Sequence, residues 1–217
     1  MAGMPTPCPV CRSPSVGVFA ELEARTYWRC ETCEATYLGV QHYPSAHEEL
    51  TQYRLHENHV DDPGYRRFLS KLAGPMLDQL GPGSEGLDYG CGPGPALAAM
   101  MNEAGHHVSL YDPFFHADTA TLTRTFDFIT CSETAEHFHQ PAEEFDRLDS
   151  LLRPGGLLGV MTCFQTDDAR FANWHYRKDP THVVFYRLST FAVLAGQRGW
   201  RFSSPAKDIV LLRKERQ

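Results

Sequence analysis

Four of the seven cysteines in this 217-residue chain occur as two closely spaced pairs. Cys8 with Cys11 and Cys30 with Cys33 give the pattern C-x2-C-x18-C-x2-C. Each C-x2-C turn can direct two thiolates toward one tetrahedral metal ion, and two such turns complete a closed four-sulfur shell. A closed shell leaves no open position for water, so the pattern predicts a structural Zn²⁺ site rather than a catalytic one.

Two alternatives remain for these pairs: a redox-active dithiol system and simple free thiols. Iron is the other metal that could fill a four-sulfur shell, although zinc suits a cytoplasmic structural module best. Because about 40 residues bury little apolar surface, a metal would supply much of the module's folding energy. The remaining cysteines are interpreted as reduced packing residues near strand ends: Cys91, Cys131 and Cys163.

A second chemically informative stretch is rich in glycine. An acid, Asp88, is followed by glycines at alternate positions, Gly90, Gly92 and Gly94, and then by a helix-compatible run. Glycines allow a sharp turn and the close approach of a ligand, and a helix start offers unpaired N–H groups. The spacing is neither the G-x-G-x-x-G dinucleotide fingerprint nor a P-loop with Gly-Lys-Ser/Thr. The stretch predicts a strand end, a ligand-binding turn and a helix start; an ordinary glycine-rich loop is the alternative.

Composition places the chain among ordinary globular proteins. Hydrophobic residues make up 42% and charged residues 22%, and the net charge is −7. The acidic balance and the lack of a long basic run argue against a broad phosphate-binding surface. We find no apolar run near the roughly 20 residues that a membrane span needs, and no N-terminal pattern typical of a signal peptide. We therefore expect a soluble, cytoplasmic protein without a membrane partner.

Strand and helix patterns alternate through most of the chain. Apolar periodicity and turn residues predict helices at 61–80, 95–104, 141–152 and 189–198, and strands at 86–90, 108–111, 126–131, 157–162 and 208–212. This alternation predicts an α/β fold whose parallel sheet carries helices on both faces and binds ligands at the carboxyl ends of its strands. The segment between Asp112 and Phe126 is too short for a full helix and strand, so one element should be shrunken or missing there.

The chain divides into three predicted parts. Residues 1–40 form the zinc-ribbon-like module, residues 41–60 a polar, histidine-rich linker with some helix, and residues 61–217 the main domain. A connector of this kind can fold over the pocket of the domain that follows it. That arrangement would bring Tyr53 and His56 close to a ligand.

Several signals of the main domain occur in one order. Asp88 and the three glycines are followed by Asp112 at the end of the second strand, 18 residues after Gly94. Three further segments come next: Thr125–Thr130, Ser132–Phe138 and Leu151–Leu158. In this order and spacing, residues 61–217 resemble the class I S-adenosylmethionine (SAM)-dependent methyltransferases. The resemblance implies a Rossmann-like, doubly wound sheet of seven strands with an antiparallel seventh strand, preceded here by the small zinc ribbon.

The resemblance also implies which residues bind SAM. Gly90, Gly92 and Gly94 would pass close to its methionine half, and Asp88 would lie at the base of the turn near its amino group. Asp112 would accept hydrogen bonds from both ribose hydroxyls, as a carboxylate can. For Asp112 the alternative is a turn residue before a proline.

Two further positions follow from the same family. Ser132, at the end of the fourth strand, is placed with the cofactor-binding residues. In the family, a residue after the third strand usually contacts adenine. The shortened segment after Asp112 leaves that counterpart open, with Asp118 and its neighbours as candidates.

The segment after the fourth strand borders the methyl-transfer site in the family. It contains Glu133, Glu136 and His137, and we predict catalytic roles for Glu133 and His137. Helix capping by Ser132 and surface charge are the structural alternatives. Residues 163–187 should lie at the same end of the sheet and select the substrate, because loops there carry binding residues.

Two residues of this substrate-selecting loop are predicted to be catalytic. His182 could act as a general base, since its ordinary pKa of about 6.5 permits proton transfer near neutrality, and Tyr186 could orient a nucleophile. Packing beneath the loop is the alternative for both side chains. Methyl transfer itself needs mainly alignment of donor and acceptor and exclusion of water, because the sulfonium is already activated.

Three functions fit these observations. The first is methyl transfer from SAM to a small-molecule acceptor, which the compact domain and acidic charge favour. The second is RNA methylation, for example of ribosomal RNA, with the ribbon as the RNA-binding part. The third is a zinc-ribbon interaction protein that binds SAM without turnover. The sequence does not indicate the acceptor or the oligomeric state.

Overall fold

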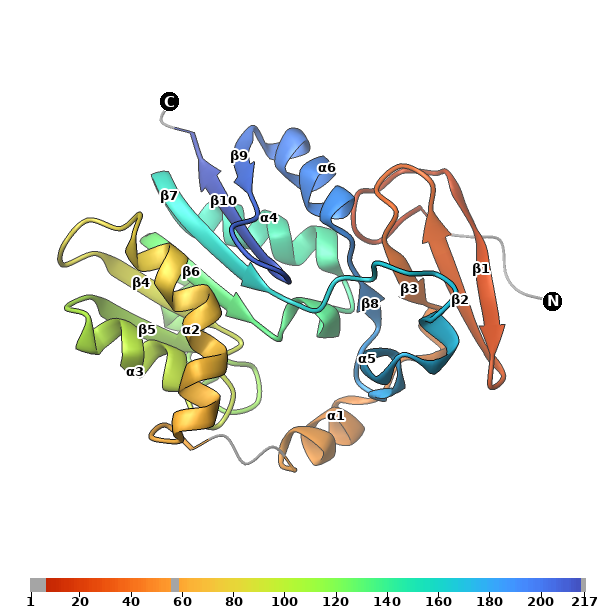
Figure 1. Ribbon diagram of the computed structural model, residues 1–217, viewed down its shortest axis with the longest axis horizontal. Coiled ribbons are helices and arrows are strands. Elements are labelled where there is room, and N and C mark those ends of the chain that lie inside the picture. The colour runs from red at the N-terminus through yellow and green to blue at the C-terminus, as the bar shows by residue number, and fades with distance from the viewer. Residues whose placement is uncertain (1–6, 56–58, 216–217) are drawn as a thin grey trace.

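The computed structural model describes residues 7–55 and 59–215 and contains two β-sheets that lie next to each other (Figure 1). The larger sheet has the strand order β5 (His107–Tyr111), β4 (Glu85–Tyr89), β6 (Phe126–Ser132), β7 (Leu152–Met161), β10 (Ile209–Lys214) and β9 (Trp200–Ser203). The smaller sheet has the order β1 (Val16–Leu22), β2 (Arg25–Cys30), β3 (Thr36–Leu38) and β8 (Val184–Phe185). His56, predicted to lie near the ligand, falls outside the described residues.

Strand directions in the larger sheet agree with the predicted doubly wound α/β fold. Strands β5, β4, β6 and β7 pair in parallel, whereas β10 runs antiparallel to both β7 and β9. The antiparallel strand near the C-terminus is therefore confirmed. The predicted count of seven strands is wrong, because the sheet built by the described residues has six.

The short segment after β5 explains the lower strand count. Between Asp112 and Phe126 the chain forms one 3-10 helix, η2 (Thr119–Thr123), so the expected shrunken element is confirmed. Asp118 caps this helix, with its Oδ1 accepting a hydrogen bond from the Ala120 N–H at 2.9 Å. This side chain caps the helix and does not line the cavity, so its position does not support a contact with adenine.

Helices cover both faces of the larger sheet. On one face lie α2 (Pro63–Leu77) and α3 (Ala96–Glu103), and on the other lie α4 (Pro141–Leu151) and α6 (Leu188–Arg198) (Figure 1). The buried side of α2 packs on the sheet through Leu69, Leu72 and Met76. Full burial of side chains of this size contributes about 1.5–3 kcal/mol each. The packed sheet therefore gives the strand ends a rigid base.

The ribbon is joined to the main domain through a shared strand. β8 comes from the loop predicted to select the substrate, yet it pairs antiparallel with β3 of the ribbon. The N–H of Leu38 also donates to the carbonyl oxygen of Val183 at 2.8 Å. The predicted domain boundaries at residues 40 and 60 stay a prediction. The smaller sheet nevertheless combines three strands from before these boundaries, β1, β2 and β3, with one strand from after them, β8.

Two short helices lie at the junction of the two sheets (Figure 1). Helix α1 (Ala46–Tyr53) begins with a capping box in which Ser45 and Glu48 satisfy each other's backbone N–H groups. Helix α5 (His175–Lys178) lies in the segment of the chain between β7 and β8. None of the helices in the described ranges combines the length and the apolar character needed to cross a membrane.

Candidate active site

A cavity of about 750 Å³ opens at the carboxyl ends of β4, β5 and β6. This is the edge at which parallel α/β sheets bind ligands. One wall is formed by the glycine turn after β4 and by the segment after β5, and another by the segment after β6. Helices α1 and α5 contribute further residues to the lining. The predicted position of the ligand site thus coincides with a cavity of suitable size for a small molecule.

The glycine turn is fixed by backbone geometry. Gly90 and Gly92 have φ angles of 77° and 64°, in the left-handed region that favours glycine. The Gly90 N–H donates to the Tyr111 carbonyl oxygen at 2.8 Å, which ties the turn to the end of β5. A Cβ atom at Gly90 would lie 2.2 Å from Thr134 Cγ2, so this position lacks room for any side chain. The turn is therefore packed tightly between β5 and the segment after β6.

Asp112 meets the glycine turn directly. Its Oδ2 accepts a hydrogen bond from the Gly92 N–H at 3.0 Å, and its Oδ1 accepts from the N–H groups of Phe114 and Phe115 at 2.8 and 3.1 Å. The residue is buried yet lines the cavity. These bonds fix the carboxylate orientation, and Oδ2, which accepts only one of them, keeps a lone pair for a further donor. A turn role for Asp112 and a ligand-binding role are thus compatible.

The other predicted cofactor residues lie at different depths. Asp88 is buried below the turn, where Thr130 Oγ1 donates to it at 2.7 Å, and burial raises its pKa to about 6. Neither Asp88 nor Gly94 lines the cavity, so both would act by shaping the turn and the start of α3. Ser132 does line it, and its Oγ has no hydrogen-bond partner among the described residues. This Oγ is itself buried, so Ser132 borders the cavity with an unpartnered polar atom below its surface.

A cluster of Glu136, His137 and His182 lines the same cavity. The His137 Nδ1 is 3.0 Å from the Thr181 carbonyl oxygen, and the His182 Nδ1 is 2.7 Å from the Tyr176 carbonyl oxygen. Since a carbonyl only accepts, each Nδ1 carries a proton, and the neutral form of each ring has a lone pair on Nε2. The centroids of the His137 and His182 rings lie 4.7 Å apart. Burial lowers the pKa of His182, which favours its neutral form.

Two carboxyl groups accompany these histidines. Glu136 is fully buried, and its oxygens accept hydrogen bonds from the hydroxyls of Thr162 and Tyr176. Glu133 lines the cavity with a φ of 48°, and burial, followed by the charge of Glu136, raises its pKa. A residue other than glycine is held in this conformation only by its surroundings. The segment after β6 is therefore constrained around its acidic side chains.

Tyr186 lies away from the cavity. Its side chain is fully buried, and its hydroxyl donates to the Ala135 carbonyl oxygen at 2.9 Å. This bond supports η3 (Ala135–His137), the short 3-10 helix that carries His137. A role of Tyr186 in orienting a nucleophile is not supported by this position, because core packing has taken the side chain out of the cavity's reach.

Several lining residues were not identified from the sequence. Glu49 comes from α1, Tyr65 from α2 and Arg147 from α4. Tyr53, which was considered as a residue folding over the pocket, does line the cavity, and its ring contacts those of His137 and Phe114 at centroid distances of 5.2 and 5.4 Å. Apart from the position of Tyr53 in the connector, no local pattern distinguishes these residues from ordinary helix surface residues.

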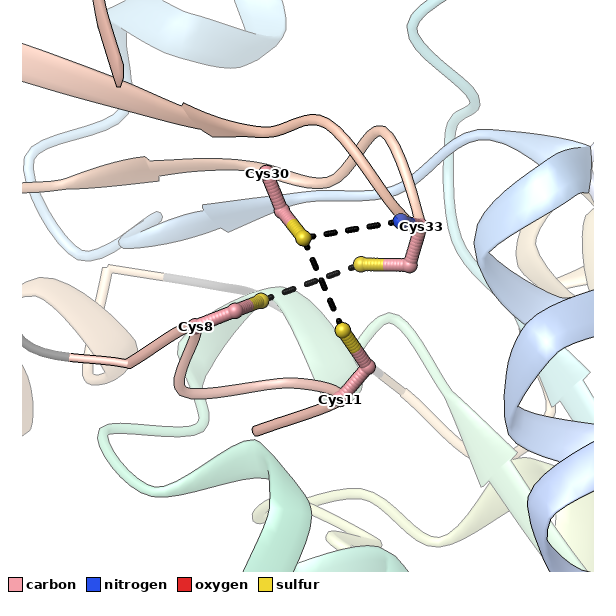
Figure 2. A group of neighbouring side chains, drawn as sticks. All are labelled: Cys8, Cys11, Cys30 and Cys33. Atoms are coloured by element: carbon pink, nitrogen blue, oxygen red, sulfur yellow. Dashed lines mark hydrogen bonds between the residues drawn. The ribbon is translucent and has the colours of Figure 1, made fainter. Parts of the chain in front are cut away.

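The four paired cysteines converge at one point in the ribbon (Figure 2). All four are buried, and the Sγ–Sγ distances are 3.7 Å for Cys8 and Cys33 and 3.5 Å for Cys11 and Cys30. A disulfide would place the sulfurs about 2.05 Å apart, so the cysteines are not paired covalently. Four sulfurs about 2.3 Å from one metal would lie about 3.8 Å from each other. The observed distances are close to this tetrahedral spacing.

The turns that carry the cysteines have the same local geometry. Arg12 and Glu34 each follow the second cysteine of a pair, with φ angles of 62° and 59°. Their N–H groups donate to the carbonyl oxygens of Cys8 and Cys30 at 2.9 and 3.0 Å. Each turn therefore curls in the same way and directs two thiol groups inward.

The fold and the cavity together define a Rossmann-like enzyme of the methyltransferase class. The family model described as a methyltransferase domain matches residues 58–204. The chain therefore belongs to this family and is a SAM-dependent methyltransferase. A search of curated proteins finds no match.

Solved structures show the same fold at low sequence identity. The 1,6-didemethyltoxoflavin-N1-methyltransferase of Burkholderia thailandensis, with bound 1,6-didemethyltoxoflavin and S-adenosylhomocysteine, covers 89% of this chain and 96% of its own, with a TM-score of 0.55 and 15% identity. Magnesium protoporphyrin IX methyltransferase from Synechocystis PCC 6803, with bound S-adenosylhomocysteine, covers 70% and 84%, with a TM-score of 0.53 and 15% identity. An O-methyltransferase family protein from Burkholderia thailandensis covers 81% and 65%, with a TM-score of 0.50 and 16% identity.

Proposed function

We propose that this enzyme transfers the methyl group of SAM to a small-molecule acceptor held in the cavity. The contact between Asp112 and Gly92 carries the proposal, because it joins the predicted ribose-binding carboxylate to the glycine turn in one wall. Two similar structures, each of a methyltransferase named for a small molecule, contain S-adenosylhomocysteine. The cavity volume also lies within the range of about 300–1,000 Å³ usual for small-molecule sites.

The donor would occupy the wall formed after β4 and β5. Asp112 would receive the ribose hydroxyls, and the backbone of Gly90 and Gly92 would pass beside the methionine half. Ser132 lies at the edge of this wall, with a buried Oγ that has no hydrogen-bond partner among the described residues. Phe114 provides an aromatic ring close to Asp112 and is our candidate for the adenine contact.

The charge of the lining favours a positively charged donor. Six carboxylate residues line the cavity: Glu49, Asp112, Glu133, Glu136, Glu144 and Asp179. Arg147 is the one lining residue of the described chain with a permanent positive charge, and it pairs with Glu144 at 2.8 Å. SAM carries a sulfonium and an ammonium group against one carboxylate, so its net positive charge complements this lining.

The acceptor would lie beside Tyr53 and the two histidines, which line the same part of the cavity. Methyl transfer there depends on alignment and exclusion of water, and α1 helps to enclose this end of the cavity. The Nε2 lone pairs of His137 and His182 support the predicted participation of these residues. Such a lone pair can accept a proton or bind a metal, and general-base catalysis by His182 stays a prediction.

We further propose that the four cysteines bind one structural Zn²⁺ ion. The sulfur spacing and the matched turns support this assignment, and a shell of four thiolates is typical of structural zinc sites. The ion would hold together a small module that contributes three strands to the smaller sheet. Removal of the ion should therefore unfold the ribbon first.

A small-molecule acceptor is favoured over RNA by the placement of the ribbon's arginines. Arg12 pairs with Asp146 of α4, and Arg29 pairs with Asp168. Both guanidinium groups therefore form ion pairs with carboxylates of the main domain and do not add to an uncompensated basic surface. Binding of RNA would usually need several uncompensated phosphate contacts.

Calorimetric titration with SAM and S-adenosylhomocysteine tests the donor site. We expect saturable binding that Asp112→Ala weakens by at least about 10-fold, since a hydrogen bond to a charged group contributes about 1.5–3 kcal/mol. Asp118→Ala is the matched control, because Asp118 follows the same strand but caps η2 outside the cavity. No binding to the folded wild type, or equal affinity in both variants, would refute the donor site.

A labelled-methyl assay tests the acceptor class. Purified enzyme is incubated with methyl-labelled SAM and either a metabolite extract or total RNA. Label in the metabolite fraction supports the proposal, whereas label in RNA alone would replace it with RNA methylation. The Asp112→Ala variant is the control for transfer that depends on the donor site.

A further inference from the structure

We infer that Glu136, His137 and His182 bind a divalent transition-metal ion at the acceptor end of the cavity. One potential ligand atom from each residue lies within 4.8 Å of the other two. Ligands about 2.1 Å from a metal lie about 3.4 Å apart in a tetrahedral arrangement. The three side chains therefore need movements on the order of an ångström to surround an ion.

The hydrogen bonds behind the two imidazoles provide independent support. Each Nδ1–H donates to a backbone carbonyl oxygen, that of Thr181 for His137 and that of Tyr176 for His182. Metal-binding histidines almost always donate their second ring N–H in this way, because the bond fixes the tautomer and the ring orientation. Both rings are therefore oriented so that, in their neutral form, Nε2 has the lone pair that a ligand needs.

The carboxylate is held in the same manner. The hydroxyl of Thr162 donates to Glu136 Oε2 at 2.9 Å, and that of Tyr176 donates to Oε1. Each oxygen still has a lone pair available. The hydroxyls orient the group without neutralising it, which is the usual arrangement around a ligating carboxylate.

Charge in this part of the cavity also favours a cation. Glu136 is fully buried, and the partners that donate hydrogen bonds to its carboxylate in the described chain are hydroxyl groups and not cations. Asp179 lies on the same wall and uses its carboxylate to accept from Thr181. A buried carboxylate without a positive partner is costly, and a divalent ion would supply that partner at the position the histidines define.

The donor set indicates which metal and which substrate would fit. Two imidazoles and one carboxylate suit zinc, cobalt, iron or manganese better than the all-oxygen shells of calcium and magnesium. Three protein ligands leave coordination positions open toward the cavity. The inferred substrate is therefore an acceptor that binds the metal through a hydroxyl oxygen, an assignment that rests on the proposed function.

The metal would prepare that oxygen for methylation. Coordination lowers the pKa of a hydroxyl, so its proton leaves to solvent and an alkoxide or phenolate remains on the metal. A lone pair of this oxygen then forms the C–O bond as the S–CH₃ bond breaks. The products are a methyl ether and S-adenosylhomocysteine, and the positive charge of the sulfonium cancels the negative charge of the oxyanion.

Titration of the full-length protein with Co²⁺ tests the site. The four-cysteine site is first saturated with zinc, and the protein is freed of loosely bound metal. We expect one further Co²⁺ ion to bind with visible d–d absorption but without thiolate-to-cobalt charge transfer. His182→Ala and Glu136→Gln should each weaken this binding by at least about 100-fold, since even loss of a supporting residue costs about 10–100-fold. His175→Ala is the matched control, because His175 lines the same cavity outside the cluster and should leave Co²⁺ affinity unchanged.

A parallel titration with S-adenosylhomocysteine separates this inference from the proposed function. Donor binding that survives in His182→Ala and Glu136→Gln shows that these variants are folded. Absence of a further Co²⁺ ion in wild type with intact donor binding would overturn the metal site alone. Equal Co²⁺ affinity in wild type and His182→Ala would overturn it as well. Absence of donor binding in wild type would count against the proposed function and would leave the Co²⁺ result to decide the metal site.

Discussion

The substitution Gly90→Ala tests how tightly the glycine turn packs against the segment after β6. An added Cβ would lie 2.2 Å from Thr134 Cγ2, 2.5 Å from its Oγ1 and 2.9 Å from its Cβ. Rotation of the threonine side chain moves the first two atoms but not the third, so the backbone must shift. The φ of 77° adds strain, because a left-handed conformation costs an L-residue about 1–2 kcal/mol.

These two effects set the expected magnitude. Overpacking in a filled site costs about 1–3 kcal/mol, and together with the strain this gives a loss of about 3 kcal/mol in the free energy of unfolding. For a chain of this size, each kcal/mol lowers Tm by about 2–4 °C, so Tm should fall by about 6–12 °C. Urea unfolding and differential scanning calorimetry measure the two quantities.

Gly92→Ala is the matched control for the clash. Gly92 has a φ of 64°, but no described heavy atom lies within 4 Å of its added Cβ, so it should lose only the strain of about 1–2 kcal/mol. The double variant Gly90→Ala/Thr134→Ala should recover part of the loss, because it removes the contacts at 2.2 and 2.5 Å. Equal losses for the two single variants, or no recovery in the double variant, would refute this reasoning.

Three other substitutions have definite expected outcomes. The pKa of Asp88 is raised to about 6, chiefly by burial, so the folded state binds the Asp88 proton more tightly than the unfolded state does. As the pH rises from 4 to above 6, wild type should therefore lose up to about 3 kcal/mol of unfolding free energy relative to Asp88→Asn. Urea unfolding of both proteins at each pH measures this difference. Tyr186→Phe should cost about 1–2 kcal/mol in stability through the lost bond to Ala135, with methyl transfer per folded molecule retained; a large fall in that rate would restore a catalytic role for Tyr186. Cys33→Ser should reduce bound zinc, which elemental analysis measures. The variant should show faster amide hydrogen exchange at Val183 while its affinity for S-adenosylhomocysteine stays close to that of wild type. Unchanged exchange at Val183 would contradict the coupling between ribbon and cavity.

The wall proposed for the donor could be located from the sequence because its signals are local. The glycine spacing specifies the turn, and Asp112 ends the neighbouring parallel strand. Parallel strands that alternate with helices bring such ends together at one edge. The missing strand before Phe126 could also be predicted, because too few residues are available there. The two parts of the donor wall accordingly meet at 3.0 Å between Gly92 and Asp112.

The acceptor side depends on contacts between distant segments, which the sequence does not specify. β8 has two residues and pairs with β3, almost 150 positions earlier in the chain, so no periodic pattern reveals it. His182 and Tyr186 lie four positions apart in a loop rich in functional residue types, yet one lines the cavity and the other lies in the core. Composition identifies such a loop as chemically capable, but tertiary packing decides which side chains reach the ligand.

The position of Val183 suggests why a ribbon is joined to this methyltransferase domain. The Val183 N–H donates to the Glu136 carbonyl oxygen at 2.9 Å, and its own carbonyl oxygen accepts from Leu38 of the ribbon at 2.8 Å. One residue therefore links the ribbon edge to the segment that carries Glu136, and it directly follows His182. Within residues 7–55 and 59–215, no backbone hydrogen bond of this kind joins the ribbon to the turn and strand ends of β4 and β5. Metal binding by the ribbon should accordingly order the acceptor side of the cavity more than the SAM side, so that loss of zinc affects catalysis before it affects donor binding.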